Sequence, residues 1–411
     1  MTRKEYSVIV LVLGALCTIS PFSVDMYLPG FPAIAQDLNT TIAQVQQSLT
    51  AYLIGISVGQ LIYGPLLDRF GRKWPLYVGI IIYMITSLLC ALTESAEQLI
   101  VMRFFQAVGG CAGLVSAQAL VRDLFPANKT AQAFSLLTLV VAVSPMIAPT
   151  IGGYVTAAFG WHAMFIILAG ISAFILAGVY FLLPQGKQPD PSISLHPSAV
   201  LKNFYIVLSQ PQFLLYMLVG GIATAAPYAY IAGSADVFMN IFKVSEKEYG
   251  WIFSLIALAM IGSTQLNHII LRKFKSEQVI KATLAYQMIV GIVLVIGTLF
   301  EWYNKTGLVI MLLVFLTGQG LTGPNATALS LAPFVRHAGS AVAVMGSFRM
   351  AMGGLVSFIV SFLHNGTAMP MVIGMFLCTV TGTSIMLIKR INKLYRARKD
   401  KGKEATITWD L

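Results

Sequence analysis

Charged residues are scarce in this chain of 411 residues, at only 10% of the total, against about 25% in soluble globular domains. Apolar types reach 57%. This composition excludes an ordinary soluble enzyme, and it excludes a disordered chain, which would be poor in apolar residues and rich in charge. Cysteine is sparse too, since four residues are too few for a disulfide scaffold. The composition indicates an integral membrane protein.

Catalytic and metal-binding patterns are also lacking. The five histidines and four cysteines are scattered, without the paired spacing of a metal site or a nucleophilic catalyst. The stretch G-Q-G-L-T-G at 318–323 matches a dinucleotide fingerprint, but that motif needs a preceding strand and an aqueous helix N-terminus, and this stretch is embedded in an apolar segment. We therefore expect no enzyme activity, no bound metal and no cofactor. A membrane enzyme or a receptor is the alternative class, and it lacks a supporting motif.

Twelve apolar stretches are long enough to cross a bilayer, because a hydrocarbon core of about 30 Å needs about 20 helical residues. They do not alternate with period two, which argues against a membrane β-barrel. The sequence predicts an all-α membrane protein with twelve transmembrane helices at 7–28, 49–67, 75–93, 98–119, 132–153, 160–183, 212–234, 250–271, 279–300, 307–329, 339–362 and 369–388.

The 27 lysines and arginines are distributed unevenly over the two sides of these spans. The side that carries the N-terminus has 22 of them, and the opposite side has only Lys243, Lys247 and Lys305. The positive-inside rule then predicts cytoplasmic N- and C-termini in a bacterial inner membrane. The net charge of +11 is thus explained by topology, and no nucleic-acid partner is expected. Arg103 and Arg349 remain inside spans.

The chain divides at a long loop, 184–211, that contains five prolines and is typical of a linker. The six spans before it and the six after it start at a nearly constant offset, which indicates an internal repeat. Because six is even, the halves enter the membrane in the same direction and form parallel repeats. We predict an N-terminal six-helix bundle at 1–183, the linker, a C-terminal bundle at 212–388 and a basic cytoplasmic tail at 389–411.

Three segments carry a family resemblance. Residues 64–73 read G-P-L-L-D-R-F-G-R-K, which is similar to the signature loop G-x-L-x-D-R-x-G-R-K of the major facilitator superfamily. Residues 103–109, R-F-F-Q-A-V-G, are similar to that family's R-x-x-Q-G-x-G element, and residues 148–153, A-P-T-I-G-G, resemble its antiporter motif G-P-x-x-G-G. In each of the last two, alanine replaces the first glycine of the motif.

Four further segments, at 25–29, 121–125, 324–329 and 338–341, resemble the Bcr/CflA branch of drug/proton antiporters. The resemblance implies a V-shaped twelve-helix fold with alternating access, and export of small drug-like or antibiotic compounds in exchange for protons. The alternative is a proton symporter that imports a specific polar metabolite. The expected partners are a small-molecule substrate and membrane lipids, and the functional unit is expected to be a monomer.

Intramembrane charges are the first candidates for function, because a charge at bilayer depth costs at least ~2.5 kcal/mol and is retained for a reason. Asp25 and Arg103 fall at similar depths in the outer half of the first repeat, so we predict an ion pair. Burial favours a neutral Asp25 and Arg103 favours its carboxylate, so a small rearrangement would change its proton affinity. These two residues are the predicted proton-coupling site. A permanent salt bridge that only fixes helix packing is the alternative.

Polar and aromatic residues near the midplane are candidates for a substrate cavity. Arg349 is expected to bind an anionic or polar group of the substrate, or to bond backbone carbonyls structurally. Gln319 and Asn325 are equally compatible with hydrogen bonds between helices, and tyrosines are common at span ends in any case. The predicted cavity set is Tyr27, Gln106, Tyr228, Gln319, Asn325 and Arg349.

The signature loop is expected to act as a conformational latch at the cytoplasmic mouth, with Asp68 paired to Arg122. The alternative is that its basic residues only determine topology, and both can hold. The predicted latch is Asp68, Arg69, Arg72, Lys73 and Arg122. The antiporter motif, by resemblance, supplies a hinge at Pro145, Pro149, Gly152 and Gly153.

Overall fold

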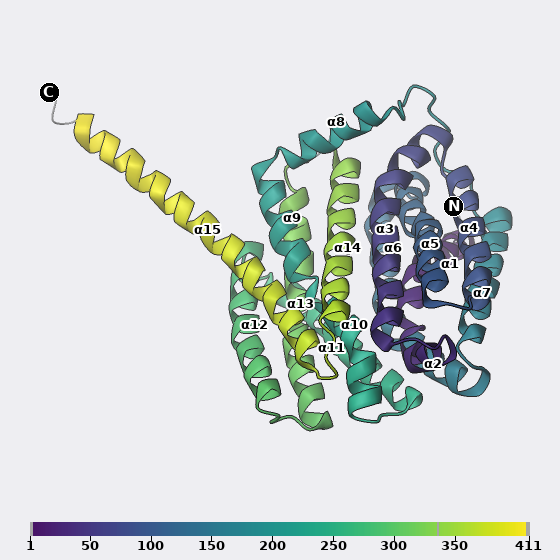
Figure 1. The fold of residues 1–411 in the computed structure, drawn as a ribbon. Coiled ribbons are helices and arrows are strands. Elements are labelled where there is room, and N and C mark those ends of the chain that lie inside the picture. Colours follow the sequence, from purple (N-terminus) through teal and green to yellow (C-terminus); the bar gives the residue numbers. More distant parts are fainter. Residues whose placement is uncertain (1–2, 335–336, 408–411) are drawn as a thin grey trace.

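The computed structural model describes residues 3–334 and 337–407, and every regular element in that part of the chain is helical (Figure 1). Twelve segments are long and apolar enough to cross a membrane, which confirms the predicted number. Each overlaps its predicted span, but several extend farther, as in Glu5–Asp37 and Ile42–Phe70. The first half contains α1 (Arg3–Asp25), η1 (Leu28–Gly30), α2 (Phe31–Asp37), α3 (Ile42–Phe70), α4 (Lys73–Ala91), α5 (Ala96–Leu124), α6 (Ala127–Phe159) and α7 (His162–Leu182).

The second half begins with the linker helix α8 (Pro197–Leu208), which runs across the ends of the other helices in Figure 1. We call this end of the molecule the linker side. The remaining elements are α9 (Pro211–Ala223), α10 (Ala226–Ala235), the π-helical turn η2 (Asp236–Ile241), α11 (Glu246–Ile270), α12 (Ser276–Leu299), α13 (Lys305–Leu331), α14 (Ala338–Phe362) and α15 (Met369–Ile407). Helix α15 continues past its apolar span and projects from the bundle (Figure 1).

Two predicted spans are interrupted. The first was expected to be continuous over 7–28, but α1 ends at Asp25 and the chain passes through a 3-10 turn that starts at Leu28. The seventh, expected at 212–234, breaks between α9 and α10. A proline lies in the first turn of the element after each break, where its missing N–H costs no hydrogen bond.

Side-chain caps fix the starts of four helices at the end opposite the linker. Thr41, Ser95, Ser245 and Asn304 each accept a hydrogen bond from the backbone N–H three residues on. Such a cap satisfies one of the four N–H groups that a helix N-terminus leaves unpaired, and it contributes about 1 kcal/mol. The caps therefore set where α3, α5, α11 and α13 begin.

The two halves pack against each other mainly through α3 with α14 and α6 with α11. Small residues allow the close approach. A Cβ atom on Gly354 of α14 would lie 2.8 Å from the Ile54 side chain of α3, and one on Gly250 of α11 would lie 2.9 Å from the Pro149 carbonyl oxygen of α6. These two helix pairs frame the space between the halves.

Candidate functional site

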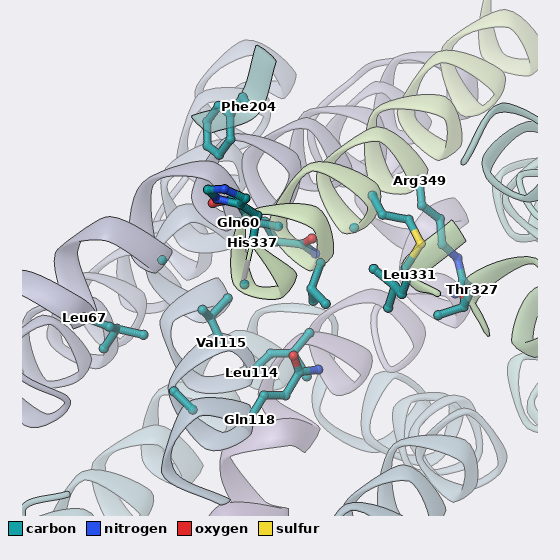
Figure 2. A pocket seen from close by; sticks show the side chains of 18 of the residues that line it. Gln60, Leu67, Leu114, Val115, Gln118, Phe204, Thr327, Leu331, His337 and Arg349 are labelled. Carbon is teal, nitrogen blue, oxygen red and sulfur yellow. The ribbon is translucent and has the colours of Figure 1, made fainter. Parts of the chain in front are cut away.

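A cavity of about 930 Å³ lies between the halves, at the upper end of the volume range of small-molecule sites. Its walls come from α3, α5 and α6 on one side and from α9, α13 and α14 on the other. Figure 2 shows lining residues from both halves, with Leu114, Val115 and Gln118 from α5 and Thr327, Leu331 and Arg349 from α13 and α14. The cavity reaches the linker side, where residues of the linker and α8, including Ile193 and Phe204, also line it.

The end opposite the linker is closed where α6 crosses α11. A Cβ atom on Gly153 would lie 2.5 Å from the carbonyl oxygen of Glu246, in the other half. Hydroxyl groups tie the crossing together, because Thr150 and Ser254 are hydrogen-bonded at 2.9 Å and Ser254 Oγ also donates to the Met146 carbonyl. Gly153 of the antiporter motif therefore permits a close approach of the two backbones at this end.

Gly152 of the same motif has a different neighbour. A Cβ atom there would lie 1.9 Å from the Met26 carbonyl oxygen, so α6 packs directly on the backbone that follows Asp25. Pro145 and Pro149 lie inside α6, which remains one helix through both. The motif thus holds the segment carrying Asp25 and, one residue later, contacts the second half.

A line of hydroxyl groups joins α3 to α14. Ser57 Oγ donates to the Ser347 carbonyl at 2.9 Å and lies 2.9 Å from its hydroxyl. Farther from the linker, Thr50 donates to Ser357 at 3.0 Å, and Ser361 Oγ donates to the Ala43 carbonyl. We call Thr50, Ser57, Ser347, Ser357 and Ser361 the hydroxyl seam. It closes that side of the space between the halves.

Arg103 is completely buried, but the predicted ion pair with Asp25 is absent from this conformation. Its Nη1 donates to Gln106 Oε1 at 2.5 Å and its Nη2 donates to the Ser23 carbonyl at 2.7 Å. The guanidinium carbon lies 4.2 Å from the ring centre of Tyr52 and 4.6 Å from that of Tyr27. Desolvated cation–π contacts of this kind contribute about 2 kcal/mol, so aromatic faces and neutral oxygens replace the expected carboxylate.

Asp25 instead interacts electrostatically with the second half. Its side chain is 4% exposed at the end of α1, and it has no hydrogen bond or ion pair with the described residues. It lies within electrostatic reach of three phenols of the second half, Tyr228, Tyr230 and Tyr249. Tyr228 also interacts with Arg349 of α14. The phenols that interact electrostatically with Asp25 therefore lie across the interface between the halves.

The latch residues form a different network from the one predicted. Arg72 pairs with Asp68 at 2.8 Å and with Asp123 at 2.6 Å. Burial lowers the pKa of the Arg72 guanidinium, but its hydrogen bonds to Asp123 and Asp68 outweigh burial and raise that pKa above its usual value. The expected pair between Asp68 and Arg122 is absent, because Asp68 lies one helical turn before Arg72 and is used by it. Arg122 instead stands 6.0 Å from the Phe134 ring centre.

The linker is tied to this network. Arg69 Nη1 donates to the carbonyls of Pro191 and Ile193 at 2.7 and 2.5 Å, and the backbone N–H of Lys187 donates to Asp123 at 3.2 Å. Lys73 begins α4 and is half-buried. In this conformation the latch residues therefore join the first half to the linker rather than to the second half.

The other predicted cavity residues lie away from the cavity. Tyr27 is buried and shares a hydrogen bond with Ser48 at 2.5 Å, and Gln106 donates to Ser87 at 2.7 Å while accepting from Arg103. Gln319 donates to the Ala223 carbonyl and Asn325 to Asn267 Oδ1, which are the hydrogen bonds between helices that the alternative interpretation anticipated. Tyr228 contacts Met350. Of the six predicted residues, Arg349 alone lines the cavity.

Several residues of the candidate site were not predicted from the sequence. Gln60 and Gln118 line the cavity, yet each is one glutamine in a long apolar helix, and nothing local distinguishes them from glutamines that bond a neighbouring helix. Asp123 had a usable signal, since it directly follows Arg122 at the end of a span on the basic side. An acid among bases at a helix end is a natural ion-pair partner.

Comparison with known proteins agrees with this architecture. The family model described as Major Facilitator Superfamily matches residues 13–358. The bicyclomycin resistance protein homolog of Haemophilus influenzae is 32% identical over 381 residues, which cover 92% of this chain and 95% of that protein. Multidrug resistance protein D of Escherichia coli is 29% identical over 371 residues, 88% of this chain and 91% of that protein.

Solved structures share the fold at low sequence identity. A bacterial homolog of the human lysosomal transporter Spinster aligns with a TM-score of 0.73 at 16% identity, over 94% of this chain and 96% of the other. A D-xylose–proton symporter aligns with a TM-score of 0.71 at 14% identity, over 93% and 97%. The chain is a multi-pass membrane transporter and not an enzyme, it is related to drug-resistance proteins, and it belongs to the Major Facilitator Superfamily.

Proposed function

We propose that this protein is a proton-coupled antiporter that exports small, largely apolar drug-like compounds from the bacterial cytoplasm by alternating access. One observation carries the proposal: a cavity of about 930 Å³ is walled by both halves, reaches the linker side, and is closed at the other end by the crossing of α6 and α11. A transporter in one of its two access states requires such a space.

The orientation of the chain in the membrane determines the side to which the cavity opens. The excess of basic residues on the linker side supports cytoplasmic termini and a cytoplasmic linker in the inner membrane. The cavity then faces the cytoplasm, where an exporter loads its substrate. We propose that the unit is a monomer and that the moving bodies are residues 1–183 and 212–388, joined by the linker 184–211.

Substrate release requires the reverse arrangement. The hydroxyl seam and the contact at Gly153 would open, and the cytoplasmic mouth would close. Arg72 with Asp68 and Asp123 stands at this mouth. We propose that this charged network contacts the second half when the mouth closes and so acts as the latch.

Proton coupling is assigned to Asp25. A buried acid without an ion pair favours its neutral form, and access to water with a cation nearby favours its carboxylate. Asp25 lies outside the cavity lining, so we propose that proton and substrate bind at separate places and compete through conformation. Rocking the halves changes which groups of the second half face Asp25. Arg103 then has a positioning role, because it bonds the carbonyl of Ser23 two residues before Asp25.

The test is uptake into everted membrane vesicles under an imposed pH gradient, with a panel that includes bicyclomycin and chloramphenicol. Vesicles with the protein should accumulate at least one compound when their interior is acidic, and Asp25→Asn should abolish accumulation. Asp190→Asn is the matched control, since Asp190 is a half-buried linker acid outside the cavity lining. Accumulation by Asp25→Asn equal to the unmodified protein would refute the assignment.

A second function deserves the same test because Arg349 lines the cavity without a partner among the described residues. Such a cation suits a symporter that imports a polar metabolite. Right-side-out vesicles distinguish the two: a symporter accumulates its substrate with protons entering, whereas an antiporter accumulates substrate only in everted vesicles.

A further inference from the structure

Arg349 is the most unusual charged residue of the cavity. It lies on α14, its side chain is exposed to the cavity, and it makes no ion pair or hydrogen bond within residues 3–334 and 337–407. Figure 2 shows it in the wall on the same side of the view as Thr327. A guanidinium in this position keeps its five donors available for a ligand.

The acidic residues that line the cavity are not paired with Arg349. Asp68 and Asp123 line the cavity at its mouth, and both are bound by Arg72. Arg122 is a second cation at the mouth, beside the Phe134 ring. Among the described lining residues, the full charges without an ionic partner are therefore positive, and an electropositive cleft raises the local concentration of anions.

The rest of the inner wall is apolar or neutral. Met217, Met345 and Met350 offer flexible apolar surface that adapts to varied shapes. Gln118 and Thr327 offer hydrogen bonds without charge. A complementary ligand has a mostly apolar body and a single anionic group.

We propose that Arg349 is an anion-binding subsite, so that the transported class includes compounds in which an apolar body carries a carboxylate, sulfonate or phosphonate. This proposal rests on the transport function proposed above and names its substrate class. A guanidinium recognises such groups with two parallel hydrogen bonds. Lipophilic cations are disfavoured by the same field.

Tyr228 supports the placement of Arg349. Its ring packs against α14 where a Cβ atom on Gly353 would lie 2.6 Å from it, and its hydroxyl contacts Met350 Sδ at 3.5 Å. The ring therefore lies along the turn of α14 that carries Arg349. Arg349 lines the cavity and Asp25 does not, so an anion at Arg349 and the proton at Asp25 occupy separate places.

Two dyes with the same ring system provide the test. Sulforhodamine B is net anionic and rhodamine B ethyl ester is cationic, and fluorescence anisotropy measures the affinity of each for the purified protein. We expect the anionic dye to bind more tightly. Arg349→Gln should weaken its binding roughly 10- to 150-fold, the equivalent of a charged hydrogen bond, and Arg349→Lys should retain part of the affinity.

Arg272→Gln is the matched control, since it removes the same charge from an exposed loop residue on the linker side and should leave both affinities unchanged. A preference for the cationic dye, failure to bind either dye, or an unchanged sulforhodamine B affinity in Arg349→Gln would overturn the subsite. Uptake in everted vesicles tests the anion subsite separately from the transport function. Accumulation of the cationic dye driven by a pH gradient would support the proposed exporter and refute the anion subsite.

Discussion

Gly153 offers the sharpest test of how the end opposite the linker closes. A Cβ atom at Gly153 would lie 2.5 Å from the Glu246 carbonyl oxygen, where real side chains stay beyond 3.0 Å. Gly153→Ala therefore forces α6 and α11 apart by about half an ångström, and both neighbours are backbone. Overpacking of this kind destabilises the state in which this end is closed by about 1–3 kcal/mol. The equilibrium between the two access states should shift by roughly five- to 150-fold.

The shift can be measured by cysteine labelling. Gln118→Cys places a thiol in the cavity wall, and the four native cysteines are buried. An impermeant maleimide should label this thiol in everted vesicles, and Gly153→Ala should slow the labelling. Gly170→Ala is the control, because nothing lies within 4 Å of a Cβ atom there. If Gly153→Ala and Gly170→Ala label at the same rate, the crossing of α6 and α11 does not govern access.

Three other substitutions probe separate contacts. Arg103→Lys should destabilise the fold by about 1–3 kcal/mol, because an ammonium cannot keep two directed hydrogen bonds and both ring contacts. An unchanged melting temperature in detergent would contradict this expectation. Arg72→Gln leaves the carboxylates of Asp68 and Asp123 unpaired at the mouth, so turnover should fall more than substrate affinity, and equal losses would refute the latch. Ser57→Ala removes a hydrogen bond of the hydroxyl seam worth about 1 kcal/mol and should slow labelling about fivefold; unchanged labelling would show that the seam has no role in access.

The helices were predictable because membrane spans are set by the length of apolar sequence, which is a local property. The breaks after Asp25 and after Ala223 were not predicted. Pro29 and Pro227 lie near them, but a proline inside an apolar run is also compatible with a kink. Whether the helix kinks or ends depends on what packs against it. At the break after Asp25, α6 packs against the chain through Gly152.

The proposed pair of Asp25 and Arg103 illustrates a second limit. Counting residues along a helix gives the depth of a side chain, but pairing also depends on the direction in which it points around the helix axis. Arg103 points into the first half among the rings of Tyr27 and Tyr52, and Asp25 interacts electrostatically with Tyr228 of the second half. Both directions follow from packing between segments distant in sequence, which one sequence does not reveal.

Arg349 was predicted as a cavity residue for a physical reason, and it lines the cavity. A charge inside a span is too costly to face lipid, so its exposure to an internal space could be inferred before the fold was known. Neutral residues such as Gln319 and Asn325 carry no comparable penalty. Their hydrogen bonds to neighbouring helices satisfy them equally well. Residue type alone therefore did not distinguish a cavity-lining role from a bond between helices.

The central claim is that protonation of Asp25 and substrate binding oppose each other. Linkage requires this to be reciprocal: if a bound proton weakens substrate binding, then bound substrate must release protons. The direct measurement is the pH change of a weakly buffered solution of purified protein when a transported compound from the vesicle panel is added. We predict proton release by the unmodified protein and none by Asp25→Asn. Binding without proton release, or equal release from both proteins, would contradict the account.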